Sequence, residues 1–223
     1  PHRGLFYTLK KNKLTVLGDI GCYTLGAVAP LAAVDTVICM GASVSGLHGF
    51  SKSQQGAMDN RTVAVIGDST FMHSGITGLV NMAYNESNAT VIIVDNSITG
   101  MTGHQQNPTT GYNLKGDPCA KIDLETLCRA VGIRRVRVID PYDLAQCDAV
   151  IKEELAAQQK GFVISQDQLH IALLGQPEQQ RNAMFAPVNH IAQDEQEVLI
   201  GKAAPVQKIL EFLRMDTVKI EVT

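Results

Sequence analysis

The chain has 223 residues, 45% hydrophobic and 18% charged, which suits one well-buried domain and leaves too little for two large ones. The formal net charge is −3 without a basic block, and no apolar run reaches the roughly 18 residues needed to cross a membrane. We therefore expect a cytoplasmic protein that binds neither nucleic acid nor membrane. Because the chain begins at Pro1 rather than Met, we expect it to be a piece of a longer protein.

Six short apolar, mostly β-branched segments alternate with helical patterns along the chain. The expected strands cover residues 14–17, 36–40, 62–66, 90–94, 135–139 and 162–165, and the expected helices cover residues 23–33, 46–56, 71–84, 124–131 and 142–158. This alternation predicts an α/β fold, a doubly wound and mostly parallel sheet with helices on both faces. Open sheets of this kind bind ligands beyond the carboxyl ends of their strands.

The first three strands end in glycine-rich polar turns. The turn after the first strand is Gly18-Asp19-Ile20-Gly21-Cys22, where we expect Asp19 to cap the following helix. The second strand ends in Met40-Gly41-Ala42-Ser43, and we expect the neighbouring Cys39 to be a core residue.

Asp68 and Asn96 each come directly after an apolar strand that should be buried. A carboxylate, a carboxamide and the carbonyl of Ile98 would offer oxygen ligands to a hard divalent cation, with positions left for phosphate oxygens. Asp68 could also serve as a helix N-cap, and the two roles are compatible because helix N-termini attract phosphate. Residues 96–123 form a long segment without periodicity, which is either a functional loop or a mobile surface loop.

The two turns above belong with three further segments, Gly67-Asp68-Ser69-Thr70-Phe71, Met101-Thr102-Gly103 and Pro108-Thr109-Thr110-Gly111. On these segments together, the chain resembles the large subunit of indolepyruvate:ferredoxin oxidoreductase from Pro1 to about Leu155. The resemblance implies a thiamine diphosphate-binding fold in which Asp68, Asn96 and the Ile98 carbonyl hold Mg²⁺. It also implies that the loop after Asn96 wraps the diphosphate. The other residues expected at the cofactor are Gly21, Cys22, Thr24, Gly41, Ser43, His48, Gly67, Ser69, Met101 and Thr102.

The family oxidatively decarboxylates aryl 2-oxoacids to acyl-CoA and passes the electrons through iron-sulfur clusters to ferredoxin. Its activating glutamate comes from a separate pyrimidine-binding domain, and no segment of this chain matches that domain. The five cysteines show no Cys-x-x-Cys spacing, so clusters are expected only outside this chain. The resemblance thus implies a module that is inactive alone and works in an oligomer, with a pyrimidine-binding domain, an iron-sulfur or ferredoxin partner, a 2-oxoacid and CoA.

The resemblance fails after about Leu155, so we expect a cofactor domain at residues 1–165 and a divergent extension of unknown role at 166–223. In the extension, residues 166–196 favour an irregular arm, 203–214 an amphipathic helix and 217–222 an edge strand. Two other functions remain open. One is a non-catalytic cofactor-holding or interaction module. The other is a Mg²⁺-dependent phosphohydrolase with Asp68 as nucleophile.

Overall fold

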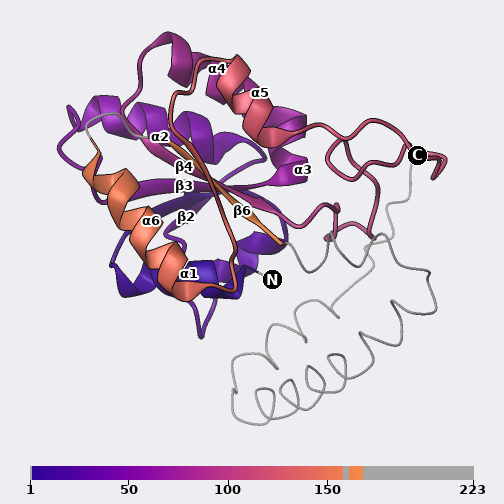
Figure 1. Cartoon of the computed structure of the whole chain (residues 1–223). Coiled ribbons are helices and arrows are strands. Elements are labelled where there is room, and N and C mark those ends of the chain that lie inside the picture. Colours follow the sequence, from indigo (N-terminus) through magenta and orange to yellow (C-terminus); the bar gives the residue numbers. More distant parts are fainter. Residues whose placement is uncertain (1, 158–160, 168–223) are drawn as a thin grey trace, which may run out of the picture. The chain divides into compact units, whose positions relative to one another are not determined.

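A computed structural model of the chain describes residues 2–157 and 161–167 (Figure 1). These residues belong to one compact unit. The extension was expected at residues 166–223, and from residue 168 onward it lies outside the described residues. Gln166 is the last residue of β6. The arm, helix and strand expected beyond it stay predictions, as does the domain boundary at 165/166. None of the helices in the described part is long and apolar enough to cross a membrane.

A six-stranded parallel sheet forms the centre of the unit. Its strands are β1 (Thr15–Gly18), β2 (Thr36–Val37), β3 (Thr62–Gly67), β4 (Thr90–Asp95), β5 (Val136–Ile139) and β6 (Phe162–Gln166). They lie in the order β2-β1-β3-β4-β6-β5, and every neighbouring pair is parallel. The prediction of a mostly parallel α/β sheet is confirmed. All six carboxyl ends therefore meet at one edge, where the polar turns follow the strands.

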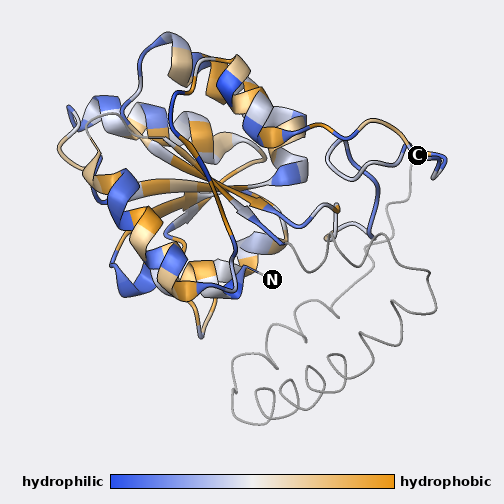
Figure 2. Cartoon of the chain, in the orientation of Figure 1, coloured by the Kyte–Doolittle hydropathy of each residue, from blue (hydrophilic) through white to orange (hydrophobic). Residues whose placement is uncertain are grey.

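Helices cover both faces of the sheet, and the strands are the most hydrophobic part of the fold (Figures 1 and 2). On one face, α1 (Arg3–Lys11) and α6 (Leu144–Ala156) pack with Val63 and Val65 of β3. On the other, α2 (Ala42–Ser53), α4 (Ile76–Tyr84) and α5 (Leu124–Ala130) pack with Ala64 and Ile66 of the same strand. Successive residues of β3 thus point to opposite cores, which is why the strand is apolar throughout.

The helices differ from the prediction near the start of the chain. Helix α1 was not predicted, although its buried residues Leu5, Phe6 and Leu9 have helical spacing. The helix expected at residues 23–33 is a short 3₁₀-helix, η1 (Cys22–Ala27). Helix α2 begins at Ala42, earlier than the expected start at residue 46.

Strand β2 ends at Val37 and is therefore shorter than the strand expected at residues 36–40. The prediction that Cys39 lies in the core was wrong, because Cys39 follows the end of this strand and is exposed. The helix expected at residues 71–84 is one continuous helical run of α3 (Asp68–Thr70), the π-helical η2 (Phe71–Gly75) and α4. This run starts at Asp68, directly after β3.

Candidate functional site

Asp68 and Asn96 come together at the carboxyl ends of β3 and β4. Asp68 is almost fully buried, with 2% of its surface exposed. The side-chain amide of Asn96 lies 2.9 Å from the Ile98 carbonyl oxygen and 3.2 Å from Asp68 Oδ1. The two neighbouring strands therefore place all three predicted metal ligands around one point.

The Asn96 amide has two orientations that differ only in which atom faces the other ligands. If its nitrogen faces them, it donates hydrogen bonds to Ile98 O and Asp68 Oδ1. If its oxygen faces them, Asn96 Oδ1 also accepts from the Ile98 amide at 3.3 Å, and three oxygens converge without a proton between them. Oxygen ligands at right angles on Mg²⁺ lie about 3 Å apart, since each is about 2.1 Å from the ion. The second orientation therefore fits an ion of this size.

The turn that aims the Ile98 carbonyl is held by Asp95, the last residue of β4. Its Oδ1 accepts hydrogen bonds from the backbone amide of Ser97 at 2.8 Å and from Ser97 Oγ at 3.0 Å. Ser97 has a φ of 51°, a left-handed conformation that is uncommon for residues other than glycine. An aspartate that accepts from the amide two residues on is a common way to stabilise such a turn.

The second oxygen of Asp68 accepts hydrogen bonds from two residues that were not among the predicted site residues. Thr109 Oγ1 donates to Asp68 Oδ2 at 2.6 Å, and Asn107 Nδ2 donates to it at 3.1 Å. Both belong to the long loop after β4, which folds back over the end of β3. Thr109 belongs to the segment Pro108-Thr109-Thr110-Gly111, which is part of the family resemblance and could have indicated this residue, whereas Asn107 lies just before that segment.

Burial and the nearby charge of Asp95 raise the pKa of Asp68 to about 6, although hydrogen bonds from Thr109, Asn107 and the Ser69 amide act in the opposite direction. The carboxyl is therefore mostly ionised at neutral pH but poorly solvated. A cation next to Oδ1 would relieve this unfavourable charge.

Asp19 organises the turns after β1 and β2. It is fully buried, and its Oδ2 accepts from the Gly41 amide at 2.8 Å and from Ser43 Oγ at 3.0 Å. Gly41 precedes α2 with a φ of 85°, which favours glycine. The prediction that Asp19 caps its own helix was wrong, because its side chain reaches the start of α2 from the neighbouring strand.

Tyr23 connects this cluster to the Asp68 turn. Its hydroxyl donates to Asp19 Oδ1 at 2.8 Å, while its ring lies against two of the predicted site residues, Gly21 and Gly67. A Cβ atom on Gly67 would be 2.7 Å from Tyr23 Cε1, closer than side chains pack. The residue before Asp68 must therefore be glycine for the ring to keep this position.

We expect Gly67→Ala to lower the free energy of unfolding by about 1 to 3 kcal/mol, because its methyl group overpacks against Tyr23. Gly49→Ala in α2 is the matched control, since a Cβ there meets no atom within 4 Å. An alanine at that helical position should stabilise the fold by about 0.5 to 1 kcal/mol. Urea denaturation of both variants measures the difference, and equal changes would contradict the packing argument.

The remaining predicted cofactor residues lie around this edge with different surroundings. Ser69 Oγ is 2.7 Å from Thr99 Oγ1, and Thr24 Oγ1 donates to the Asp19 carbonyl at 2.7 Å. Cys22 is exposed, and its Sγ is 3.2 Å from the position of a Cβ on Gly100, so it lies against the long loop. Cofactor contact by these residues stays a prediction.

His48 lies in α2, and its buried Nδ1 has no hydrogen-bond partner among residues 2–157 and 161–167. Met101 is 52% exposed, and the neighbouring Thr102 is exposed too, with its hydroxyl donating to Gln105 Oε1 at 2.6 Å. Among the described residues, no hydrogen bond joins His48, Met101 or Thr102 to the cluster of Asp68, Asn96 and Ile98. Their contact with the cofactor therefore stays a prediction.

Residues 19–165 match the family model of the thiamine pyrophosphate enzyme, C-terminal TPP binding domain. The chain belongs to this family. Thiamine pyrophosphate (TPP) is the same compound as thiamine diphosphate, and the match includes every residue predicted at the cofactor. The family assignment made from the sequence is confirmed.

Relatives of this TPP-binding domain are named indolepyruvate oxidoreductase subunit IorA. The protein from Thermococcus kodakarensis is 37% identical over 208 residues, covering 87% of this chain and 32% of the relative. The protein from Archaeoglobus fulgidus is 40% identical over 160 residues, covering 70% and 25%. The chain thus spans about a quarter to a third of the length of these relatives.

Solved structures share the fold of the TPP-binding domain at lower identity. A 2-oxoglutarate:ferredoxin oxidoreductase from Magnetococcus marinus matches with a TM-score of 0.62 and 17% identity, covering 74% of this chain and 60% of the other. Benzoylformate decarboxylase from Polynucleobacter necessarius matches with a TM-score of 0.53 and 16% identity, covering 75% and 33%.

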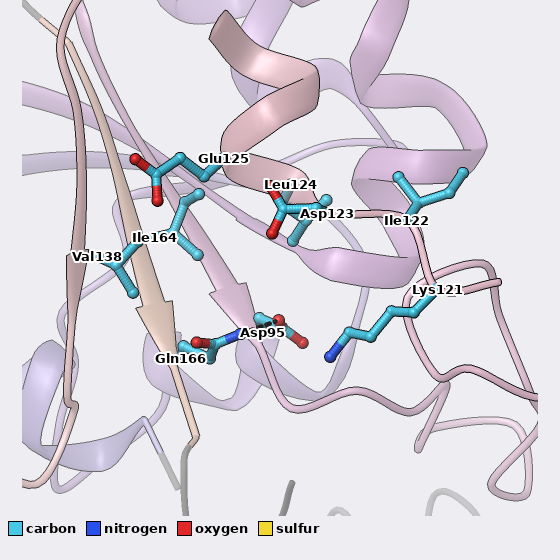
Figure 3. A pocket seen from close by; sticks show the side chains of 9 residues that line it. All are labelled: Asp95, Lys121, Ile122, Asp123, Leu124, Glu125, Val138, Ile164 and Gln166. Carbon is cyan, nitrogen blue, oxygen red and sulfur yellow. Dashed lines mark hydrogen bonds between the residues drawn. The ribbon is translucent and has the colours of Figure 1, made fainter.

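The TPP-binding domain also has a pocket of about 300 Å³ at the ends of β4 and β6. Figure 3 shows Lys121 pointing toward Asp95 across this pocket, with Gln166 beside Asp95. Lys121 Nζ is 3.5 Å from Ser97 Oγ, and Gln166 Nε2 donates to Asp95 Oδ2 at 3.3 Å. The pocket shares this edge of the sheet with the Asp68 cluster, but none of the predicted site residues lines it.

Proposed function

We propose that this domain binds thiamine diphosphate through Mg²⁺, with Asp68 Oδ1, the Asn96 amide oxygen and the Ile98 carbonyl as the protein ligands. The convergence of these three groups at separations of 2.9 and 3.2 Å is the observation that carries the proposal. One carboxylate and two neutral oxygens leave further coordination positions for phosphate oxygens, as in other Mg²⁺ sites that hold a phosphorylated ligand.

We further propose that the domain belongs to an oxidoreductase that converts aryl 2-oxoacids, such as indolepyruvate, to acyl-CoA. The names of the relatives support this substrate class, and the name of the Magnetococcus marinus enzyme includes bound coenzyme A. When bound, thiamine diphosphate supplies a site that takes up the electrons released with CO₂. The residues of this chain hold the diphosphate, orient the metal ligands and place the long loop beside the cofactor.

The rest of the active site is proposed to come from other parts of an oligomeric enzyme. A pyrimidine-binding domain would supply the activating glutamate, and an iron-sulfur part would carry electrons to ferredoxin. Membership of a TPP enzyme family favours this function over the phosphohydrolase alternative. The contacts of Asp68 agree, because a nucleophilic carboxylate in a Mg²⁺-dependent phosphohydrolase needs one oxygen for the phosphorus besides the one at the metal. Oδ1 faces the proposed Mg²⁺ position, and Oδ2 already accepts two hydrogen bonds.

We expect thiamine diphosphate and Mg²⁺ together to raise the melting temperature of the chain by several degrees, and either one alone to raise it much less. A ligand at 100 times its dissociation constant contributes about 2.7 kcal/mol. In a protein of this size each kcal/mol corresponds to about 2 to 4 °C. Thermal denaturation with the cofactor, the metal, both or neither measures this effect.

Thiamine monophosphate with Mg²⁺ is the control, because it keeps the rings and lacks the second phosphate. A folded wild-type chain without any shift at saturating cofactor and metal would contradict the proposed function. An equal shift with the monophosphate would show that the diphosphate is not what the metal site recognises.

A further inference from the structure

The two oxygens of Asp68 have different surroundings. Oδ1 faces the Asn96 amide at 3.2 Å, at the proposed metal position. Oδ2 faces the loop and accepts from Thr109 Oγ1 at 2.6 Å and from Asn107 Nδ2 at 3.1 Å. A carboxylate oxygen has about two acceptor positions, so these two donors fill Oδ2.

The donors are themselves held in place. Thr109 is fully buried, and its backbone amide donates to Asn107 Oδ1 at 2.8 Å. Thr109 Oγ1 lies 2.6 Å from Asn107 Oδ1 as well, so its single proton has two acceptors. The ionised Asp68 carboxylate is the stronger acceptor, because hydrogen bonds to charged groups are the stronger ones. Asn107 Nδ2 also donates to Thr99 Oγ1 at 3.4 Å, so both ends of this side-chain amide are held by hydrogen bonds.

With Oδ2 occupied, Asp68 can offer only Oδ1 to a metal. Mg²⁺ requires nearly ideal octahedral geometry with short bonds, and a single carboxylate oxygen suits it. Ca²⁺ takes 6 to 8 oxygens at longer distances and often uses both oxygens of a carboxylate. A carboxylate restricted to one oxygen therefore favours the smaller ion.

We propose that Thr109 and Asn107 determine the metal specificity of the site: by holding Asp68 Oδ2, they limit Asp68 to one metal bond and select Mg²⁺ over Ca²⁺. This inference rests on the proposed function, because it assumes that the Asp68 cluster binds the metal of thiamine diphosphate. It gives the long loop a role in choosing the ion in addition to its place beside the cofactor.

The test compares the dissociation constant of thiamine diphosphate with saturating Mg²⁺ and with saturating Ca²⁺, measured by calorimetry on the full chain. The wild type should bind more tightly with Mg²⁺. Thr109→Val keeps the shape of the side chain and removes the donor to Oδ2. We expect it to weaken Mg²⁺-supported binding by about tenfold, as for other partners of metal ligands. Ca²⁺-supported binding should be retained or strengthened, because Oδ2 becomes available to the larger ion.

Three further variants make the result specific. Thr109→Ser keeps the hydroxyl that Thr109→Val removes, so this variant should keep the preference for Mg²⁺. Asn107→Ala removes the longer hydrogen bond to Oδ2 and should lower the preference for Mg²⁺ by a smaller factor than Thr109→Val. If Thr109→Val does not fold, Asn107→Ala provides the test. Thr90→Val at the opposite end of β4 is the matched control, since Thr90 is fully buried and its Oγ1 has no hydrogen-bond partner among the described residues.

The outcomes separate this inference from the proposed function. If the wild type binds thiamine diphosphate with neither ion, the proposed function fails and the inference fails with it. If the wild type binds but Thr109→Val loses affinity equally with both ions, or with neither, only the specificity role is overturned. A lower preference for Mg²⁺ in Thr109→Val and Asn107→Ala, with Thr90→Val unchanged, supports it.

Discussion

Replacing Asp68 with Asn is expected to raise the stability of the cofactor-free protein and to abolish its stabilisation by thiamine diphosphate and Mg²⁺. In the absence of a metal, Asp68 is a buried carboxylate beside the charge of Asp95, and its pKa is raised to about 6. Relative to an unfolded value near 3.9, this shift costs about 3 kcal/mol at neutral pH. Asparagine has the same shape without the charge, and its amide oxygen can accept from Thr109 and Asn107 at the position of Oδ2.

The gain in stability from Asp68→Asn should depend on pH. A folded pKa above the unfolded value means that the folded state disfavours the ionised carboxyl, so the penalty is fully present above about pH 6. It disappears as the pH falls toward the unfolded value near 3.9. The gain in stability from Asp68→Asn should therefore be largest at pH 7 to 8 and vanish near pH 4.

Chemical denaturation of the wild type and Asp68→Asn across this pH range, with and without cofactor and Mg²⁺, measures both effects. Loss of the carboxylate from the proposed Mg²⁺ site should weaken cofactor binding by at least about 100-fold, more than the loss of a residue that supports a ligand. Glu86→Gln, at an exposed position after α4, is the control because it removes one negative charge elsewhere. A cofactor shift of wild-type size in Asp68→Asn would show that the metal is held elsewhere.

The 223-residue chain alone is expected not to decarboxylate indolepyruvate or phenylpyruvate, even when it is loaded with cofactor and Mg²⁺. Anchoring the diphosphate fixes position, but proton transfer at the aminopyrimidine needs a positioned acid or base. The sequence has no Cys-x-x-Cys spacing, so under the proposed function we expect the iron-sulfur electron acceptor to belong to another part of the enzyme. Reduction of a viologen dye in the presence of CoA measures the overall reaction.

Adding the proposed pyrimidine-binding and iron-sulfur parts should restore CoA-dependent dye reduction with an aryl 2-oxoacid. Asp68→Asn in the restored enzyme should remove that rate while the chain stays folded. Substantial dye reduction by the chain alone would mean that it contains a base and an electron carrier that we did not recognise. A restored rate that is insensitive to Asp68 would contradict its role as a metal ligand.

The central strands were predictable because burial on both faces leaves a simple pattern. In β3 and β4 every residue is buried, so a continuous apolar run marked each strand to within about a residue. At the edge of the sheet the signal is weaker. Strand β2 pairs with β1 alone and ends at Val37, so the apolar residues after it are exposed. Periodicity cannot separate such residues from a core strand.

That Asp68, Asn96 and Ile98 come together was predictable because Asp68 and Asn96 directly follow neighbouring strands, and parallel strands bring their ends to one edge. Their role as metal ligands stays a prediction. The contacts of Thr109 and Asn107 were not predictable, because they meet Asp68 only after a loop folds back over a distant strand, and such a contact has no local pattern. Asp19 was assigned to the wrong helix for a related reason. Capping preferences identify a residue type suited to a helix start, but the start that Asp19 stabilises belongs to α2 and reaches it through the neighbouring strand.

The strand order has a consequence for how the domain reaches its native state. Strand β6 is the last in sequence, yet it lies between β4 and β5 and pairs with both. During synthesis, β4 and β5 must therefore wait for Phe162–Gln166 to leave the ribosome before the sheet can close. Until then each has an unpaired edge of the kind that favours aggregation. A nascent chain stalled before residue 162 should depend on chaperones, whereas one released after residue 167 should complete the sheet.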